Sequence, residues 1–385
     1  MQMPKRIMCV VGARPNFMKI APLMRELQRA DTFESYLVHT GQHYDAAMKQ
    51  AFFEQLQIPE PDEDLGVGSA SHAVQTAEIM RRFEPILDRE LPDAVLVVGD
   101  VNSTIACALV AAKKQVPVIH VEAGLRSFDR SMPEEINRVL TDQVSDLLFT
   151  TERGALDNLV REGVDSERVH FVGNVMIDTL LHNRERAPSV AAVLRRAEIG
   201  SAAPARFGVV TLHRPSNVDD TQTLARLVDT LNELGAELPL LFPVHPRTAS
   251  RLGSAGLMEP ARGACTLLPP LDYLDMLALL QGATMVLTDS GGIQEETTAL
   301  GVPCLTLREN TERPITVTQG TNTIVGADPE RILGIARSTL RDGGKAGRIP
   351  EYWDGRAARR IVDTLEHWFR QRGAPADPTN DGHQP

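Results

Sequence analysis

The stretch Ala94-Val95-Leu96-Val97-Val98-Gly99-Asp100 indicates the architecture of this chain. An uninterrupted apolar run before a glycine is typical of a strand buried on both faces, as in a parallel sheet covered by helices. Similar runs recur at residues 7–11, 36–38, 116–121, 147–150 and 169–172, and again at residues 207–212, 238–244, 284–288 and 303–307. Segments with apolar residues at helical spacing, such as residues 17–30, lie between them. We therefore predict an α/β fold with two Rossmann-like parallel-sheet domains.

The chain divides into two halves of similar size. Its 385 residues suit two or three domains at about 100–200 residues each. The strand pattern restarts after a charged, alanine-rich stretch at residues 184–204, which we expect to be a helical linker. We place the first domain at residues 1–180 and the second at residues 181–354, followed by an amphipathic helix over residues 357–370. Residues 373–385 are rich in proline, glycine and aspartate, and we expect this tail to be disordered.

Composition excludes several classes of protein. The formal charge of −11 disfavours general nucleic-acid binding, which depends on clustered Lys and Arg. No apolar stretch reaches the ~18–20 residues of a membrane helix, and the N-terminus does not resemble a signal peptide. The four cysteines lie far apart, which fits neither a disulfide framework nor a zinc site. We expect a cytoplasmic protein with no membrane or nucleic-acid partner.

Polar clusters follow almost every predicted strand. They read GARPN (12–16), HTGQH (39–43), GDVNST (99–104) and HVEAGLR (120–126) in the first half, and HRPSN (213–217), HPR (245–247) and DSGG (289–292) in the second. Ligands of parallel sheets bind outside the carboxyl ends of the strands. Clusters in register in both halves predict a single cleft between two facing sheets.

The second half contains a candidate phosphate loop. Ser290, Gly291 and Gly292 stand where a strand passes into a helix, so free backbone N–H groups and the positive helix end favour a phosphate. The alternative is a serine cap with glycines making a tight turn. The carboxylates of Glu295 and Glu296 are either dipole partners of the helix or acceptors for ribose hydroxyls. Neither half contains G-x-G-x-x-G, so we expect no nicotinamide or flavin cofactor.

Three carboxylates form the second candidate group. Asp100 and Glu122 each follow an apolar strand and should be half-buried, whereas Glu134 follows Pro133 at a helix start. Neighbouring carboxylates push their pKa values apart, which suits acid/base chemistry. Metal binding with His120 or His213 is the alternative, but no spacing is diagnostic of a metal. The cations that could meet an anionic ligand are Arg14, Lys19, Arg214, Arg247, Arg308 and Arg313.

Together these motifs resemble the non-hydrolysing UDP-N-acetylglucosamine 2-epimerases. The resemblance rests on GARP (12–15), HTGQH (39–43), GD (99–100), HVEAGLR (120–126), PEEINR (133–138), HR (213–214), DSGGIQEE (289–296) and TERP (311–314), in the order of that family. It implies a glycosyltransferase-B-like architecture in which a C-terminal helix at residues 355–372 crosses back to complete the first domain. It also implies a homodimer that needs no cofactor and no metal.

The resemblance further implies reversible conversion of UDP-N-acetylglucosamine to UDP-N-acetylmannosamine. In that family the C2 proton and UDP are lost to give 2-acetamidoglucal, and UDP then adds back. The residues that match the family are Asp100, Glu122, Glu134 and His213 for catalysis, Arg14, Lys19, His213, Ser290, Gly291, Gly292, Glu296 and Arg313 for UDP, and Gln42, His43, Arg214 and His245 for an allosteric UDP-sugar site.

Two loops depart from the common family pattern. Residues 127–132 (SFDRSM) form a shorter loop, and residues 213–217 read HRPSN in place of HRREN. Relatives acting on UDP-linked 2,3-diacetamido uronic acids share the short loop, so such a sugar is the alternative substrate. A hydrolysing epimerase and a retaining glycosyltransferase of the same fold are further alternatives.

Overall fold

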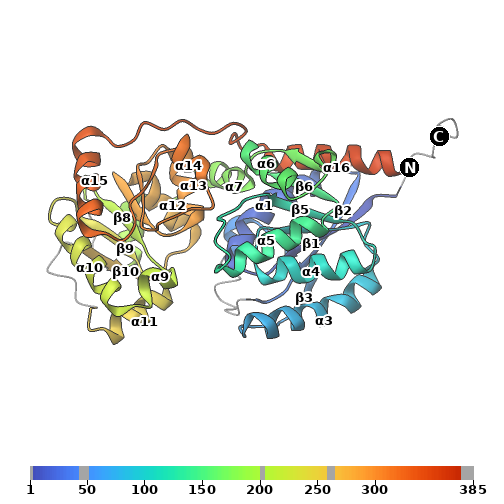
Figure 1. Cartoon of the computed structure of the whole chain (residues 1–385), viewed down its shortest axis with the longest axis horizontal. Coiled ribbons are helices and arrows are strands. Elements are labelled where there is room, and N and C mark those ends of the chain that lie inside the picture. Colours follow the sequence, from blue (N-terminus) through green and yellow to red (C-terminus); the bar gives the residue numbers. More distant parts are fainter. Residues whose placement is uncertain (1–2, 43–51, 200–203, 258–264, 374–385) are drawn as a thin grey trace.

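A computed structural model describes residues 3–42, 52–199, 204–257 and 265–373 of the chain. It contains two entirely parallel sheets, one in each half of the sequence (Figure 1). We call each sheet with the helices packed on it a lobe. The first sheet comprises β1 (Lys5–Val11), β2 (Phe33–His39), β3 (Glu63–Asp64), β4 (Ala94–Val98), β5 (Val118–Ala123), β6 (Leu147–Thr150) and β7 (Val169–Phe171), in the order β3-β2-β1-β4-β5-β6-β7. The predicted parallel α/β fold is confirmed.

The second sheet repeats the same winding. It comprises β8 (Gly208–Thr211), β9 (Leu240–Pro243), β10 (Cys265–Leu268), β11 (Met285–Thr288), β12 (Cys304–Thr306) and β13 (Asn322–Ile324), in the order β10-β9-β8-β11-β12-β13. In each sheet the strand order reverses beside the first strand, at β1/β4 and at β8/β11. Such a reversal opens a crevice at the carboxyl ends of the strands.

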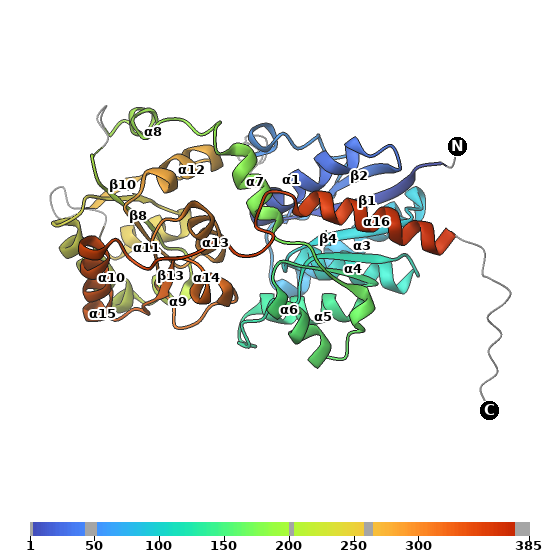
Figure 2. The same cartoon turned by 90° about the horizontal axis from the view of Figure 1, so that it is seen from above.

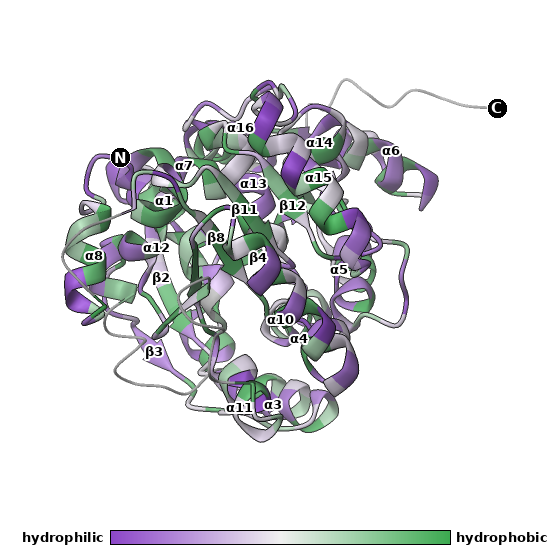
Figure 3. Ribbon diagram, turned by 90° about the vertical axis from the view of Figure 1, so that its left-hand side faces the viewer, coloured by the Kyte–Doolittle hydropathy of each residue, from purple (hydrophilic) through white to green (hydrophobic). Residues whose placement is uncertain are grey.

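Helices separate the strands and cover both faces of each sheet. In the first lobe they are α1 (Arg14–Arg29), α3 (His72–Glu90), α4 (Asn102–Lys113), α5 (Pro133–Val144), α6 (Arg153–Arg161) and α7 (Val175–Asn183). From the second half of the chain come α8 (Val190–Arg196), α9 (Pro215–Val218), α10 (Thr221–Gly235), α11 (Pro246–Ser254), α12 (Tyr273–Gly282), α13 (Gly291–Leu300), α14 (Pro314–Thr318), α15 (Pro329–Asp342) and α16 (Ala357–Gly373). Figure 3 shows the central strands β4, β8 and β11 as hydrophobic and the outer helices as mixed.

Helix α16 follows the second lobe in sequence but packs on the first. It runs along α1 and also contacts α7 (Figure 2). Ile361, Val362 and Leu365 are fully buried in the same core as Leu23 and Leu27 of α1. The amphipathic helix predicted at residues 357–370 is therefore present, and its apolar side closes the first lobe.

Some local expectations were wrong. Within the described residues 184–199 of the expected helical linker there is one short helix, α8, which begins after Pro188 with Ser189 as its cap. Strands β3, β10 and β13 were not predicted, because these short edge strands lack a long apolar run. The expected boundary at residue 180 falls inside α7, and the domain limits stay a prediction. The tail at residues 374–385 lies outside the described residues.

Among the described residues, no helix is long and apolar enough to cross a membrane. The four cysteines are buried and free.

Candidate active site

Several of the residues predicted to form the site make contacts between the two lobes. Glu122 ends β5 of the first sheet, and Arg313 follows β12 of the second; their side chains form an ion pair with an Nη2 to Oε1 distance of 2.8 Å. Asn174, before α7, donates to Glu295 of α13 at 2.9 Å. Polar side chains of both lobes therefore meet in one interface, and the single cleft expected from the strand-end clusters stays a prediction.

Glu122 is the most enclosed of the three predicted carboxylates. Its φ of +76° accompanies a bulge between Val121 and Ala123, which turns the side chain away from the regular strand path. One oxygen lies 2.7 Å from Lys19 Nζ and 2.8 Å from Arg313. The expectation of half-burial was wrong: Glu122 is 2% exposed. Two buried cations compensate the charge, which would otherwise be very unfavourable in the interior.

The second oxygen of Glu122 has no hydrogen-bond partner among the described residues, although it is buried. Most buried acceptors in proteins have a donor, so this oxygen is a candidate to accept a hydrogen bond from a bound molecule.

Asp100 lies on the neighbouring turn, after β4. Its Oδ2 accepts a hydrogen bond from Arg138 Nε at 2.9 Å, and its side chain is partly exposed. Burial alone would raise the pKa of Asp100, but the charges of Arg138, Lys19 and Arg313 hold it below the usual value. Asp100 is therefore ionised at neutral pH.

The third carboxylate, Glu134, starts helix α5 and is partly exposed. In the described part of the chain no bond joins it to Asp100 or Glu122. Its neighbour Glu135 points back under the loop that follows β5, where it accepts from the backbone N–H groups of Ser127 and Phe128 at 2.9 Å and pairs with Arg138. Glu135 therefore fixes the short loop.

In the second lobe, His213 and the glycine turn lie side by side. The His213 Nδ1 is 2.8 Å from Asp289 Oδ1, and the backbone N–H groups of His213 and Arg214 also donate to this buried carboxylate. Ser290 caps α13 by position, but its side chain accepts no capping hydrogen bond. The first N–H groups of α13, at Gly291 and Gly292, thus remain available to an anion, as the phosphate-loop interpretation requires.

Gly291 is required by close packing. A Cβ at this position would lie 2.6 Å from an oxygen of Glu312. Glu312 in turn pairs with Arg308 at 2.9 Å and lies 3.5 Å from Arg214. Deeper in the same helix, Glu296 is buried beside Tyr273, and burial and the Glu296 charge raise the pKa of this tyrosine.

Arg313 connects these groups. Its Nε lies 2.8 Å from Glu295 Oε1, and it is 5% exposed. Burial raises the pKa of Glu295, while the Arg313 charge opposes the shift. Burial also raises the pKa of Glu152, at the start of α6, to about 7. Several carboxylates thus surround one guanidinium, and an anionic ligand would have to share it with them.

The four residues matched to an allosteric site are only partly described. The Oε1 of Gln42 accepts from the N–H and the hydroxyl of Ser103 at 3.2 and 2.7 Å. The rings of His245 and His213 lie 5.8 Å apart, which places His245 at the rim of the second lobe. His43 and the side chain of Arg14 lie outside the described residues.

Sequence reasoning missed the contacts that hold the site together, although several of the residues lay in its motifs. The contacts are made by Arg138, Glu135, Asp289, Asn174 and the buried pair His120 and Asp142, with the ring Nδ1 at 2.6 Å from Asp142. The PEEINR motif contained a signal for one of them, because Glu135 and Arg138 are three residues apart and share a helix face. The described residues contain no group of His, Cys, Asp and Glu that could hold a metal ion.

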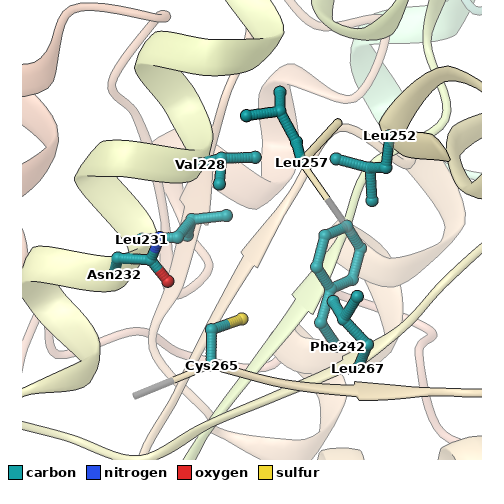
Figure 4. Close-up of a pocket in the computed structure, with 8 residues that line it drawn as sticks. All are labelled: Val228, Leu231, Asn232, Phe242, Leu252, Leu257, Cys265 and Leu267. Carbon is teal, nitrogen blue, oxygen red and sulfur yellow. The ribbon is translucent and has the colours of Figure 1, made fainter. Parts of the chain in front are cut away.

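A separate hollow in the second lobe has no such chemistry. It has a volume of about 20 Å³, enough for one water, and it is lined almost entirely by apolar side chains (Figure 4). Its walls come from α10, α11 and strands β9 and β10. We treat it as a packing defect of the core.

The sequence of residues 25–366 matches the family model of UDP-N-acetylglucosamine 2-epimerase. The chain belongs to this family. A UDP-N-acetylglucosamine 2-epimerase of Methanococcus maripaludis is 39% identical over 94% of this chain and 98% of its own length. A UDP-2,3-diacetamido-2,3-dideoxy-D-glucuronate 2-epimerase of Pseudomonas aeruginosa is 42% identical over 94% of this chain and 99% of its own.

Solved structures of the epimerase family share the fold. The Methanocaldococcus jannaschii UDP-GlcNAc 2-epimerase, in complex with UDP-GlcNAc and UDP, superposes with a TM-score of 0.86 at 38% identity, over 94% of this chain and 99% of that one. The Neisseria meningitidis UDP-GlcNAc 2-epimerase bound to UDP-GlcNAc superposes with a TM-score of 0.85 at 29% identity, over 94% of this chain and 100% of that one. The glycosyltransferase-B-like arrangement of two Rossmann-like domains is thus confirmed.

Proposed function

We propose that this chain catalyses reversible C2 epimerisation of UDP-N-acetylglucosamine to UDP-N-acetylmannosamine. The observation that carries the proposal is Glu122, which pairs through one carboxylate oxygen with the cations Lys19 and Arg313, while its other buried oxygen has no partner among the described residues. A carboxylate for proton transfer next to cations for a leaving diphosphate is what elimination of UDP requires. Family membership and the UDP-GlcNAc-bound relatives support the same reaction.

The proposed reaction is redox-neutral and needs no cofactor. A base removes the C2 proton, the bond from C1 to the diphosphate oxygen breaks, and a C1=C2 double bond forms in 2-acetamidoglucal. UDP then adds back at C1 while an acid delivers a proton to the opposite face of C2. We assign the acid and base roles to the group Asp100, Glu122, Glu134 and His213.

The nucleotide would lie on the second lobe. We propose that Ser290, Gly291 and Gly292 donate to the diphosphate at the start of α13, and that Glu296 accepts from the ribose hydroxyls. Arg14, Lys19, His213 and Arg313 would bring positive charge to the leaving group. Because the detached UDP must remain bound until it adds back, the lobes would stay closed during turnover.

Incubation with UDP-N-acetylglucosamine in deuterium oxide tests the reaction. We expect deuterium at C2 of both epimers and no free N-acetylmannosamine. Epimers without deuterium would exclude the proton-transfer mechanism, and net release of UDP with free sugar would indicate the hydrolysing alternative. UDP release that depends on an added acceptor would indicate a glycosyltransferase.

A UDP-2,3-diacetamido uronic acid is the second candidate substrate. It is favoured by the 42% identity to the Pseudomonas aeruginosa enzyme of that specificity and by the short loop at residues 127–132. Assaying both UDP-sugars side by side with the same enzyme preparation decides between them, because the substrate with the higher kcat/KM is the preferred one.

We also propose a homodimer and an allosteric UDP-sugar site around Gln42, His43, Arg214 and His245. Sedimentation that gives a monomer at micromolar concentration would contradict the homodimer.

The allosteric site is tested by the reverse reaction from UDP-N-acetylmannosamine. Added UDP-N-acetylglucosamine should accelerate this reaction, and a lack of acceleration would contradict the allosteric site.

A further inference from the structure

The ring of His120 lies between two hydrogen-bond acceptors in the interior of the first lobe. It is 0% exposed on β5, with Nδ1 at 2.6 Å from Asp142 Oδ1 and Nε2 at 2.8 Å from the carbonyl oxygen of Gly99. A neutral imidazole has one N–H and one lone pair, so it can donate to only one of them. Both contacts are favourable only when both ring nitrogens carry a proton, or when Asp142 itself does.

The surroundings of Asp142 place that proton on the ring. The other carboxylate oxygen, Oδ2, accepts from the Gly124 N–H at 3.1 Å and from Arg126 Nη2 at 2.6 Å. Burial raises the pKa of Asp142 and the Arg126 charge lowers it, and the two donors on Oδ2 favour the ionised carboxylate. Asp142 is therefore a carboxylate that accepts on both oxygens, and the ring is the donor.

Charged side chains from neighbouring elements approach the ring and its partner. Arg126 pairs with Asp142 and, on its far side, with Glu162, whose side chain is 27% exposed. From α1, Lys19 approaches the other side of Gly99, where a Cβ would lie 2.7 Å from its Nζ; this lysine is neutralised by Glu122.

We propose that His120 donates from both ring nitrogens and that, with Asp142, it positions the two turns carrying Asp100 and Glu122. Gly99 immediately precedes Asp100, and Gly124 lies two residues after Glu122; both glycines have φ values near +70°, at +68° and +77°. The ring holds the Gly99 carbonyl, and Asp142 holds the Gly124 N–H. One buried ion pair thus sets the distance between the proposed acid/base groups, and in this sense the inference rests on the proposed function.

Nitrogen-15 NMR of histidine-labelled protein tests the charge. The chain has ten histidines, and the His120 signal is the one that disappears in His120→Gln. We expect wild-type His120 to show both nitrogens protonated at pH 8, where an ordinary imidazole with a pKa of about 6.5 is neutral. In Asp142→Asn this doubly protonated signal should be lost. A neutral tautomer in the wild-type protein at pH 8 would overturn the proposal, even if His120→Gln failed to fold.

Kinetics test the positioning role. His120→Gln and Asp142→Asn should lower kcat on the order of 10²-fold, as expected when reacting groups move by about 1 Å, and leave KM and the Kd for UDP unchanged. Asp146→Asn is the matched control, because Asp146 accepts from the Val118 N–H at the opposite end of β5, at 2.9 Å. It should keep both the imidazolium signal and kcat.

The positioning role would be refuted if wild-type His120 gave the imidazolium signal but His120→Gln and Asp142→Asn both kept the wild-type kcat. If instead the wild-type protein exchanged no C2 proton with solvent, the proposed function would fail while the NMR result for His120 stood.

Discussion

The backbone of Glu122 adopts a left-handed conformation that residues other than glycine seldom adopt. A positive φ at such a residue is unfavourable by about 1–3 kcal/mol and persists where the surroundings fix it. At Glu122 the ion pairs with Lys19 and Arg313 fix it. The bulge thus turns a strand residue into a side chain aimed at the other lobe.

Glu122→Gln should reduce kcat by roughly 10²–10⁴-fold, because an amide cannot accept the C2 proton. Binding of UDP should stay the same or tighten, since Lys19 and Arg313 lose the competing charge of Glu122, while Arg313 keeps its pair with Glu295. Turnover assays and calorimetric titration with UDP measure the two effects. If the variant lost UDP binding but kept its turnover, Glu122 would be a UDP-binding residue and would not transfer the C2 proton.

Gly99→Ala should impair both stability and turnover. The new Cβ would lie 2.7 Å from Lys19 Nζ, at a φ of +68°, so we expect a loss of about 1–3 kcal/mol in urea unfolding together with a lower kcat. Gly163→Ala is the control, because Gly163 has a φ of +83° with nothing within 4 Å of its Cβ position. It should lose stability through backbone strain alone and keep kcat; equal kcat in the two variants would show that Gly99 does not position Lys19.

For individual residues, the sequence predicted which side chains form the site better than it predicted the contacts of those side chains. Asp100, Glu122 and Arg313 could be proposed because polar residues at strand ends gather at one edge. The full burial of Glu122 could not be predicted, because it depends on Lys19 and Arg313, which lie 103 and 191 residues away in the sequence.

Among the elements, helix α16 depends on a single carboxylate of α7. Asp178 accepts from the N–H groups of Ala357 and Ala358 at 3.1 and 2.8 Å, which are among the donors that a helix start leaves unpaired. Burial raises the pKa of Asp178 to about 6. The carboxyl group is therefore protonated more readily in the folded protein than in the unfolded chain.

Because the folded pKa is the higher one, the contribution of Asp178 is fully present below its unfolded pKa of about 3.9 and is lost as the pH rises through about 6. Asp178→Asn has no such titration. We expect the stability of the wild-type protein, measured relative to this variant by denaturant unfolding, to fall between pH 4 and pH 6. A difference that is constant over this interval would show that the carboxyl pKa is unperturbed.

Periodicity and apolar runs predicted the long elements and failed at short polar ones. The apolar strands around β4, β5 and β11 and the helix α16 were expected where they are found. Strand β13 was missed because it contains Asn322, whose side chain is bonded to Gln294, Thr306 and Thr316. Such pairing across elements has no signature in a local window of sequence.

For the whole molecule, Arg313 is a direct link between the lobes. It is buried between Glu122 of the first and Glu295 of the second. Removing one member of a buried ion group leaves unpaired charges, so both carboxylates would then favour solvent.

Arg313→Gln should therefore widen the mean separation of the lobes and weaken UDP binding roughly 10–100-fold, the range of one charged hydrogen bond. Small-angle X-ray scattering and UDP titration measure these changes. Arg337→Gln removes surface ion pairs with Glu233 and Glu237 and is the control, expected to change neither. An unchanged radius of gyration in Arg313→Gln would mean that other contacts hold the lobes.

The return of α16 to the first lobe has a consequence for synthesis on the ribosome. The last strand of the first sheet ends at Phe171, but the core of that lobe also needs Ile361, Val362 and Leu365. At about 5–20 residues per second, these residues are made on the order of 10–40 s later. During that interval the nascent first lobe exposes the apolar side of α1. A chaperone that binds emerging apolar helices could therefore bind α1 before helix α16 has been synthesised and can cover it.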